Sequence, residues 1–592
     1  MLGRNDELNG SLVSVRIVQG ADAFAMLDSD TVRRQWASLV EDCPWATSCQ
    51  THGFAASWYT AYAEHFEPLL VLSEDRHGEL QGILALAKAR SDPRIVPVGA
   101  NQGEYKVWVC HPDLGSQFPA AAISALRNLL PPSGLTLRYL PANAPLEWLA
   151  ESGLENLCIL RHRRRPLLRF ADGGKIEHLL RKSQNKIRFN RLKKLGRVEL
   201  VRFTSRNEIE AHFDQISEAY DLRRTAVNGL PVFRRDCLKK PFYLALMDQP
   251  GVLHATALKV GDQIVSMHFN GIAKKGVFLG LTAYDPLYGQ NSPGKLHILL
   301  LAQMLKAEGF EQLDLTPGGD PFKEDFADAS DDVSTLAVYP TVNARRLAVL
   351  RYAGEDVART LLHRVSITPT TAGVQAKDLL QLGIGATFKT AARRSADWIA
   401  SRQETKIYAS DGAALPMVAA NMTIRRNNLV DLLDCRLPSD ELSRRPFVAD
   451  ALARIQQGQH LFTCIESGRL LCMAWLVEKV TKSIAEKLLP VIVPSDVPLA
   501  HDFFIAPTAT GSDAAELLLR AMLQHAAGPA GDQQVLVAVP AHTALADYCA
   551  GAPALKYRGT VFRSRRLGRQ RQWADTSPAL GCSERDRLWP HA

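Results

Sequence analysis

One order of predicted elements occurs twice along the chain, and this repeat limits the possible folds more than any other feature. Residues 54–140 predict a helix, a hairpin, further strands, a helix and a strand. Residues 209–315 predict a helix, a hairpin, a strand, a loop, a helix and a strand. Each hairpin consists of two apolar runs around a Gly-containing turn. Interleaved helices and strands of this kind indicate a mixed α/β fold, although the two copies share their order rather than obvious sequence identity.

A third α/β block follows from about residue 405, with two apolar strands around a Ser-Gly turn, a helix and closing strands. A chain of 592 residues is too long for one core. We therefore predict an α/β fold of mixed sheets flanked by helices. Its predicted segments are an N-terminal extension (1–30), a first unit (31–160), a basic helical connection (161–200), a second unit (201–335), a helical linker (336–404), a third unit (405–570) and a tail (571–592).

Composition narrows the class of protein. The chain is 46% hydrophobic and 22% charged, which is ordinary for a soluble globular protein. Its formal net charge of +8 is modest for the length and does not by itself indicate a nucleic-acid partner. The ten cysteines are scattered without a C-x-x-C pair, which argues against a disulfide framework or a zinc site. Without a signal peptide or an apolar run long enough to span a bilayer, we expect a cytoplasmic protein with no transmembrane segment.

A strongly basic stretch, LLRKSQNKIRFNRLKKLG, occupies residues 179–196. In a helix, Leu179, Leu180, Ile187 and Leu192 share one face, and lysines and arginines fill the rest. Two interpretations remain open for this stretch. It is either a solvated basic helix that packs through its leucines or a surface that faces an anion.

The loop GQNSPGKL, between a predicted strand and a predicted long helix, is the strongest candidate for a ligand site. Asn291 or Ser292 can cap the helix, Pro293 suits its first position, and Gly294 lets a ligand approach the backbone. Backbone amides at a helix start attract anions, and Lys295 adds a positive charge. The same residues also form an ordinary helix start, and the GxxxxGK[ST] spacing of a P-loop is absent.

Four segments resemble acetyltransferases of the GNAT superfamily, in the bacterial branch associated with cellulose biosynthesis. They are WASLVEDCPWATSCQTHGFAASWYTAYAEHF near the N-terminus, GEYKVWV at 103–109, the basic stretch at 179–196, and YDPLYGQNSPGKLHILLLAQMLKAEGFEQLDLTPGGDPFKEDF at 284–326. The resemblance covers roughly residues 35–330 and lies more in order and spacing than in invariant residues. This branch is similar to Fem-type peptidyltransferases, which carry two tandem GNAT-like folds. Residues 405–570 resemble a third GNAT-like unit, in which the corresponding loop has one glycine, Gly511, and no basic residue, so we expect a degenerate or regulatory copy.

The resemblance implies acetyl-CoA or another acyl-CoA as co-substrate and no metal. By position, the coenzyme A pyrophosphate would lie on Asn291, Ser292, Gly294 and Lys295. The implied chemistry is direct acyl transfer, in which an amine attacks a thioester, one group accepts the amine proton and another protonates the leaving thiolate. Positioning alone can supply much of the rate, so a dedicated base is not required.

In the first unit, Glu104 and Tyr105 stand where the resembling family tends to carry an acidic residue and a tyrosine. Glu104 is the first candidate for a general base or an amine anchor, and Tyr105 is a candidate for substrate binding. Lys323 follows a Gly-rich turn at a strand end, as in the family pattern. It would contact a carboxylate, phosphate or sugar hydroxyl of the acceptor, or else pair with Asp325.

Two further candidates belong to the second unit. Strand alternation places Ser266, His268 and Asn270 on one face, where His268 could orient substrate or move a proton. The alternative is a polar face that is exposed to solvent. Tyr288, beside the loop, is a candidate to protonate the thiolate, and packing is the alternative role.

These residues lead to one main functional hypothesis and two alternatives. The main hypothesis is an acyl-CoA-dependent N- or O-acyltransferase that acts on a small-molecule, saccharide or lipid-linked acceptor of an exopolysaccharide pathway. The first alternative is a Fem-like transferase that uses aminoacyl-tRNA, with RNA phosphates on residues 161–197. No long coiled-coil arm supports it, and we expect no stable nucleic-acid partner. The second alternative is a non-catalytic scaffold or sensor. The sequence does not specify an oligomeric state.

Overall fold

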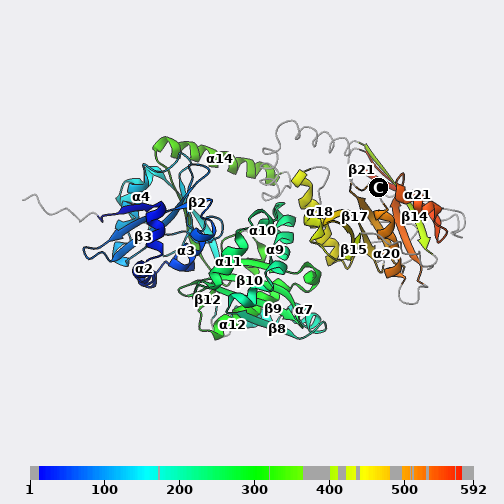
Figure 1. Cartoon of the computed structure of the whole chain (residues 1–592), viewed down its shortest axis with the longest axis horizontal. Helices are drawn as coiled ribbons and strands as arrows, with labels where there is room; N and C mark the ends of the chain where they lie inside the picture. The colour runs from blue at the N-terminus through cyan, green and yellow to red at the C-terminus, as the bar shows by residue number, and fades with distance from the viewer. Residues whose placement is uncertain are drawn as a thin grey trace, which may run out of the picture. The chain divides into compact units, whose positions relative to one another are not determined.

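The computed structural model describes residues 13–170, 174–318, 320–364, 400–410, 422–434, 440–479, 497–506, 509, 513–527, 533–566 and 569–576 (Figure 1). The chain divides into two compact units. Unit 1 comprises Met1–Tyr220 and Phe233–Val365, and unit 2 comprises Asp221–Val232 and Ser366–Ala592. Three multi-stranded sheets flanked by helices confirm the predicted mixed α/β class. In the described part of the chain, no helix has both the length and the apolar character that a membrane span requires.

The first sheet of unit 1 is antiparallel. Its strands lie in the order β1 (Arg16–Gln19), β2 (Phe66–Glu74), β3 (Leu80–Ala89) and β4 (Ile95–Pro97), and β5 (Val109–Cys110) also pairs with β3. The predicted hairpin is confirmed as β2–β3. The helices of this part are α1 (Gly20–Leu27), α2 (Asp30–Asp42), η1 (Ser48–Gln50), α3 (His52–Ala61), η2 (Pro112–Leu114), α4 (Gln117–Leu126), α5 (Trp148–Glu151) and η3 (Leu154–Leu157).

Large aromatic side chains form the core around this sheet. Trp36, Trp58, Trp108 and Trp148 are almost completely buried, and Phe118 packs in the same cluster. Burial of each such side chain stabilises the fold by roughly 2–3 kcal/mol. This core fixes the position of the loop after β4, which carries Glu104.

The second sheet of unit 1 has eight strands in the order β6-β13-β7-β12-β11-β10-β9-β8. Their bounds are β6 (Leu135–Leu140), β7 (Cys158–Arg169), β8 (Val198–Phe203), β9 (Leu253–Val260), β10 (Gln263–Ala273), β11 (Gly276–Tyr284), β12 (Gln312–Asp314) and β13 (Ala329–Val338). The predicted hairpin around the Gly-Asp turn is confirmed as β9–β10. The strand at 135–140 also forms as predicted, but it pairs with β13 at the edge of this second sheet.

The helices of this region are α6 (Lys175–Arg181), α7 (Ser183–Lys193), α8 (Arg206–Glu210), α9 (Phe213–Asn228), α10 (Val232–Arg235), α11 (Lys239–Met247), η4 (Pro286–Asn291), α12 (Pro293–Ala307), α13 (Pro321–Phe326) and α14 (Val342–Arg364). The prediction of a helical connection over 161–200 is therefore wrong in its first part, where residues 161–169 belong to β7. The prediction holds for the second part, in α6 and α7.

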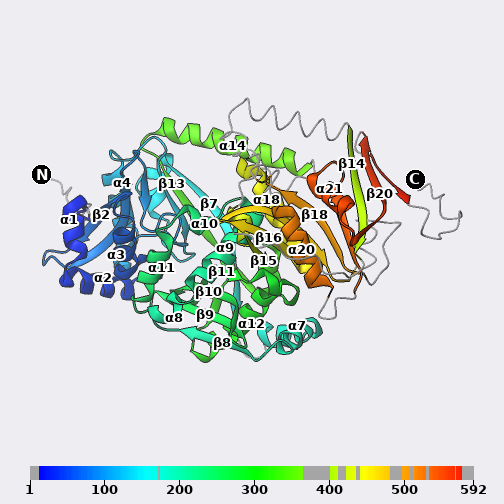
Figure 2. The ribbon, with the colours of Figure 1, turned by 45° about the vertical axis from the view of Figure 1, so that its right-hand side comes forward.

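Helix α12 crosses from β11 to β12, which run parallel, and covers one face of the sheet (Figure 2). Its apolar side packs through Ile298, Leu301 and Leu305 on Val277 of β11 and Leu313 of β12. Antiparallel neighbours can be joined by a tight turn, whereas a parallel pair needs such a crossover. The crossover brings the start of α12 to the end of β11, which is where the candidate site lies.

Unit 2 contains the third sheet, in the order β15-β16-β17-β18-β19-β14-β20-β21. Its elements are β14 (Ala400–Ser410), β15 (Thr423–Arg426), α17 (Asp431–Asp434), α18 (Asp440–Gln456), β16 (His460–Glu466), β17 (Arg469–Val477), β18 (Leu499–Ile505), α20 (Ala514–Ala526), β19 (Val535–Pro540), α21 (Ala544–Gly551), β20 (Leu555–Arg566) and β21 (Arg569–Thr576). The hairpin β16–β17, then β18, α20 and a parallel β19, repeat the order of β9–β10, β11, α12 and β12. Gly511, most of the predicted tail and residues 365–399 of the predicted linker lie outside the described residues.

Candidate functional site

The parallel strands β11 and β12 separate after three residue pairs, from Gly276–Gln312 to Phe278–Asp314. Strand β11 continues for six more residues, to Tyr284, and remains paired with β10 on its other side. Among the strands that the structure describes, none pairs with the later part of β11 on the β12 side. Backbone amides and carbonyls along this edge can bond an extended ligand in the way that an added strand would.

A bulge lies at the point where the two strands separate. Opposite β10, the register of β11 shifts between Phe278 and Leu281, so that one extra residue is inserted there. Gly280 at this bulge is exposed, whereas both Leu279 and Leu281 are buried. A Cβ atom at Gly280 would lie 2.4 Å from the backbone oxygen of Phe269, so only glycine fits this conformation.

We expect Gly280→Ala to destabilise unit 1 by about 1–3 kcal/mol, because forced overpacking costs this much. The bulge should also relax, and donor binding at this edge should weaken. Gly354→Ala in α14 is the matched control, since its Cβ meets no atom within 4 Å and its stability should not fall. Urea unfolding of both variants checks this prediction. An equal stability for Gly280→Ala and the wild type would contradict it.

The end of β11 leads through η4 into the start of α12. Pro293 takes the first helical position, as predicted. Ser292 takes the N-cap position with φ +50 and ψ 53, and its side chain makes no capping hydrogen bond. A left-handed conformation is costly for a non-glycine residue, and such strain is concentrated at functional sites.

The other predicted phosphate-binding residues surround this strained serine. Asn291 ends η4, and both Asn291 and Gly294 are half-buried. A Cβ at Gly294 would meet only the ring of Tyr284, at 3.5 Å, so space is open above this amide. Lys295 is 3.8 Å from Asp325, and its ammonium stays part-exposed. The structure thus brings all four residues together at one helix start.

Tyr288 lies in η4, on the side toward α7. It packs against an apolar cluster that includes Leu192 and Leu296. Burial, with Asp285 as a lesser cause, raises its pKa above the ordinary tyrosine value. Tyr288 thus makes the packing contacts of the alternative role, and its role as the acid stays a prediction.

On the opposite face of the sheet from α12, a cavity of about 110 Å³ reaches the bulge. Phe278 and Gly280 of β11 form one wall, and Glu104 and Gln102 of the first part of the chain form another. Burial raises the pKa of Glu104, although Arg138 and Lys323 oppose this shift. A half-buried carboxyl with a raised pKa beside the bulge is a candidate to accept a proton.

A hydrogen-bonded cluster joins Glu104's neighbours to the end of β12. The hydroxyl of Tyr105 donates to Asp314, and Arg165 of β7 lies 3.2 Å from the same carboxylate. The Nζ of Lys323 donates to the backbone oxygen and the hydroxyl of Thr316, at 3.0 and 3.1 Å. Lys323 therefore stabilises Thr316 in its left-handed conformation, φ +61, instead of pairing with Asp325. Tyr105 is likewise buried, and its hydrogen bond to Asp314 anchors the end of β12.

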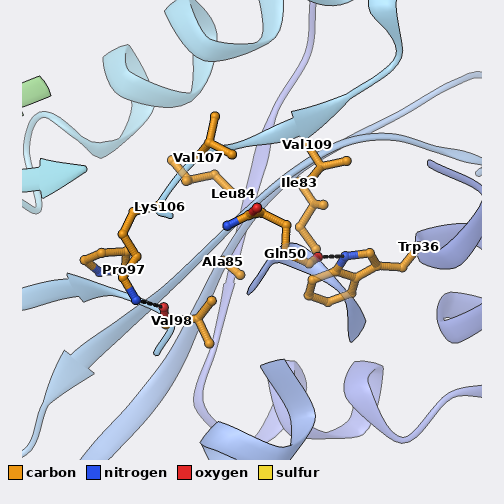
Figure 3. A pocket seen from close by; sticks show the side chains of 10 residues that line it. All are labelled: Trp36, Gln50, Ile83, Leu84, Ala85, Pro97, Val98, Lys106, Val107 and Val109. Carbon is orange, nitrogen blue, oxygen red and sulfur yellow. Dashed lines mark hydrogen bonds between the residues drawn. The ribbon is translucent and has the colours of Figure 1, made fainter. Parts of the chain in front are cut away.

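Behind the loop that carries Glu104, Lys106 points into a cavity of about 20 Å³ (Figure 3). Its ammonium donates to the backbone oxygen of Val98 at 2.9 Å, and burial lowers its pKa to about 8. Nearby, the indole of Trp36 donates to the backbone oxygen of Gln50 at 2.8 Å (Figure 3). A cavity of this size has room for about one water molecule and is too small for a substrate.

His268 lies away from the cavity, and its expected position is wrong. The Ser266, His268 and Asn270 face of β10 is covered by α12 and is neither in a cleft nor exposed to solvent; His268 is 2% exposed. Its ring stacks on that of His297 from α12 at 3.8 Å, and His297 also bonds Ser266 and Thr256. Burial lowers the pKa of His297 well below its ordinary value, so the His297 ring is held neutral.

The central segment of the chain matches a known domain family. Residues 181–324 match the acetyltransferase (GNAT) domain family. This segment is similar to GNAT-type acetyltransferase domains. It extends from the end of α6 into α13 and contains the open edge of β11, the bulge and the start of α12.

Three solved structures that match this chain each cover about half of it, at low identity and with TM-scores below 0.5. The C-terminal domain of a putative lysylphosphatidylglycerol synthetase from Agrobacterium fabrum is 12% identical, covers 54% of this chain and 94% of its own, and has a TM-score of 0.35. The same values describe L-PGS from Bacillus licheniformis. FemX is 10% identical, covers 52% of this chain and 96% of its own, and has a TM-score of 0.36. No curated protein matches the sequence.

Several residues of the site were not predicted from the sequence. Gly280 and Phe278 line the cavity, and Asp314 and Arg165 anchor the end of β12. A glycine inside the apolar strand GVFLGLTAY was a usable signal, because such a glycine often marks a bulge. The pairing of Arg165 with Asp314 joins residues far apart in the chain and has no local signal.

Proposed function

We propose that the chain is an acyl-CoA-dependent acyltransferase that acts on an amine or hydroxyl. The observation that carries the proposal is the open edge of β11 beyond Phe278, with the Gly280 bulge at one end and the strained start of α12 at the other. Amides at the helix start suit the pyrophosphate, and the open strand edge suits the amide-containing pantetheine arm. The GNAT-type domain that contains these elements supports the same activity.

The coenzyme would supply the acyl group as a thioester, and residues of this chain would do the rest. Asn291, Ser292, Gly294 and Lys295 would hold the phosphates. Glu104 would accept the proton of the acceptor from the cavity side of the bulge. The charge of Lys323 favours the carboxylate form of Glu104, so the base is available in its ionised form above its raised pKa.

The acceptor would occupy the 110 Å³ cavity. Its walls combine polar groups, including Asn101 and Gln102, with the aromatic faces of Phe54 and Tyr243. Such a lining suits a polyol or amino sugar, whose apolar ring faces pack on aromatics while its hydroxyls are bonded. From the resemblance, we propose that the acceptor is a saccharide or lipid-linked precursor of an exopolysaccharide, such as one associated with cellulose.

Calorimetric titration of acetyl-CoA tests the donor site. We expect wild-type protein to bind and the variant Gly294→Trp, Lys295→Glu to lose at least tenfold in affinity. A Cβ at Gly294 meets only the Tyr284 ring, at 3.5 Å, and circular dichroism checks that the variant is folded. Lys275→Glu, in the turn at the far end of β11, is the control and should bind normally. Folded wild-type protein that binds no acetyl-CoA would overturn the proposal.

A further inference from the structure

Helix α7 and its flanks carry a dense basic surface. Between His178 and Val198 the chain has no acidic residue. Seven cations there are exposed. Arg197 lies 3.6 Å from Glu199, and we call the other six the α7 basic face: Arg181, Lys182, Lys186, Arg191, Lys193 and Lys194. Among the residues that the structure describes, none of the six pairs with a carboxylate. A cluster of like charges without compensation indicates a surface for an anionic partner.

The α7 basic face adjoins the donor site. On its inner side, α7 packs through Leu192 and Phe189 in one apolar cluster with Tyr288 of η4 and Leu296 of α12. Figures 1 and 2 both show α7 at the rim of the second sheet. A partner seated on this face would therefore stand beside the turn that leads into Ser292 and Gly294.

The extent of the face indicates a macromolecule. Helix α7 alone, from Ser183 to Lys193, measures roughly 16 Å, since each residue adds 1.5 Å, and Arg181 and Lys182 extend the face beyond its start. Two large apolar side chains are exposed beside the cations, Ile187 at 51% and Leu195 at 61%. Protein interfaces combine apolar contacts with a charged rim. Single-stranded nucleic acid favours stacking aromatics, but the one aromatic of α7, Phe189, is turned into the apolar cluster.

We propose that the α7 basic face docks a small acidic carrier protein that presents an acyl thioester on a phosphopantetheine arm. This inference rests on the proposed function, because the arm would enter the same open edge of β11. In the transfer, the acceptor nitrogen or oxygen bonds the thioester carbonyl carbon and the C–S bond breaks. The carrier leaves as its thiol, which receives the proton that the acceptor lost. Opposite charges on carrier and helix accelerate docking more than they change the chemical step.

The test compares two donors that differ only in the carrier: acetyl-CoA and an acetylated acyl carrier protein. In Lys186→Glu, Arg191→Glu we expect kcat/KM to fall at least tenfold with the carrier-protein donor and to change less than twofold with acetyl-CoA. The control Arg76→Glu, Lys88→Glu makes the same charge change on the first sheet and should alter neither. Equal losses, or no loss, with the two donors would overturn the docking proposal and leave the proposed function standing.

A binding measurement separates this proposal from the activity. Surface plasmon resonance with immobilised holo carrier protein should show wild-type binding that weakens with salt and is lost in the α7 variant. If neither donor supports transfer, the proposed function fails and this binding result alone decides the docking proposal. Wild-type protein that binds single-stranded RNA through the same cations and ignores the carrier protein would overturn it in favour of a nucleic-acid surface.

Discussion

Replacing Glu104 by Gln is expected to lower the kcat of acyl transfer by about 100-fold or more, with little change in the KM for the acyl donor. General-base catalysis contributes about 10²–10⁴-fold, and Gln keeps the size of the side chain while removing the basic oxygen. Glu104 lines the acceptor cavity and not the helix start, so donor binding should not depend on it. Steady-state release of coenzyme A thiol measures both constants.

The pH profile gives the same prediction a second readout. Burial raises the pKa of Glu104, so the wild-type rate should rise with pH through a value above that of an ordinary glutamate. In Glu104→Gln this limb should disappear. Glu311→Gln, which removes a carboxylate that is 68% exposed, is the control and should retain both rate and profile. A Glu104→Gln enzyme with the wild-type kcat would show that positioning alone supplies the rate.

Replacing Arg165 by Met is expected to destabilise unit 1 by about 3–5 kcal/mol. The Arg165 side chain is 13% exposed and lies 3.2 Å from Asp314, and its Nε is 2.6 Å from Asp331. Removing one partner of a buried ion pair leaves uncompensated buried charge, which costs this much. The raised pKa of Asp314 under burial agrees with a carboxylate that depends on its partner.

Urea unfolding with a neighbouring control makes this prediction specific. Arg164→Met removes the adjacent arginine, which is 58% exposed and pairs with Glu324, and should cost less than about 1 kcal/mol. Adding Asp314→Asn to Arg165→Met should recover part of the loss, because the unpaired charge is then gone. Equal destabilisation by the two arginine variants would contradict the account of this cluster.

The hairpins and the α12 crossover could be predicted because the residues that specify each of them lie close together in the sequence. The turn around Gly261 and the apolar stripe of α12 are complete within short windows of sequence. The basic run 161–169 was misassigned for the opposite reason. Two of its arginines have acidic residues opposite them on β13: Arg165 pairs with Asp331, and Arg164 lies opposite Asp332 and pairs with Glu324. Opposite charges on neighbouring strands favour strand formation, but the acidic partner of Arg165 lies about 166 residues further along the chain.

Contacts with distant parts of the chain also explain why the candidate site was predicted only in part. Strand alternation correctly groups Ser266, His268 and Asn270 on one face, but it does not say that α12 covers this face. Glu104 and Lys323 were selected by family resemblance, and the structure brings their charges near the end of β12. Gly280 was missed because its requirement comes from the Phe269 oxygen of the neighbouring strand.

A crystal structure with a thioether analogue of acetyl-CoA, in which a non-transferable S-alkyl group replaces the thioester, tests the central claim most directly. The account predicts the pyrophosphate on the amides of residues 291–295 and the pantetheine arm along β11 from Gly280 toward Tyr284. The S-alkyl group should point to the cavity with Glu104. An analogue bound elsewhere on the chain, with the β11 edge unchanged, would contradict the account.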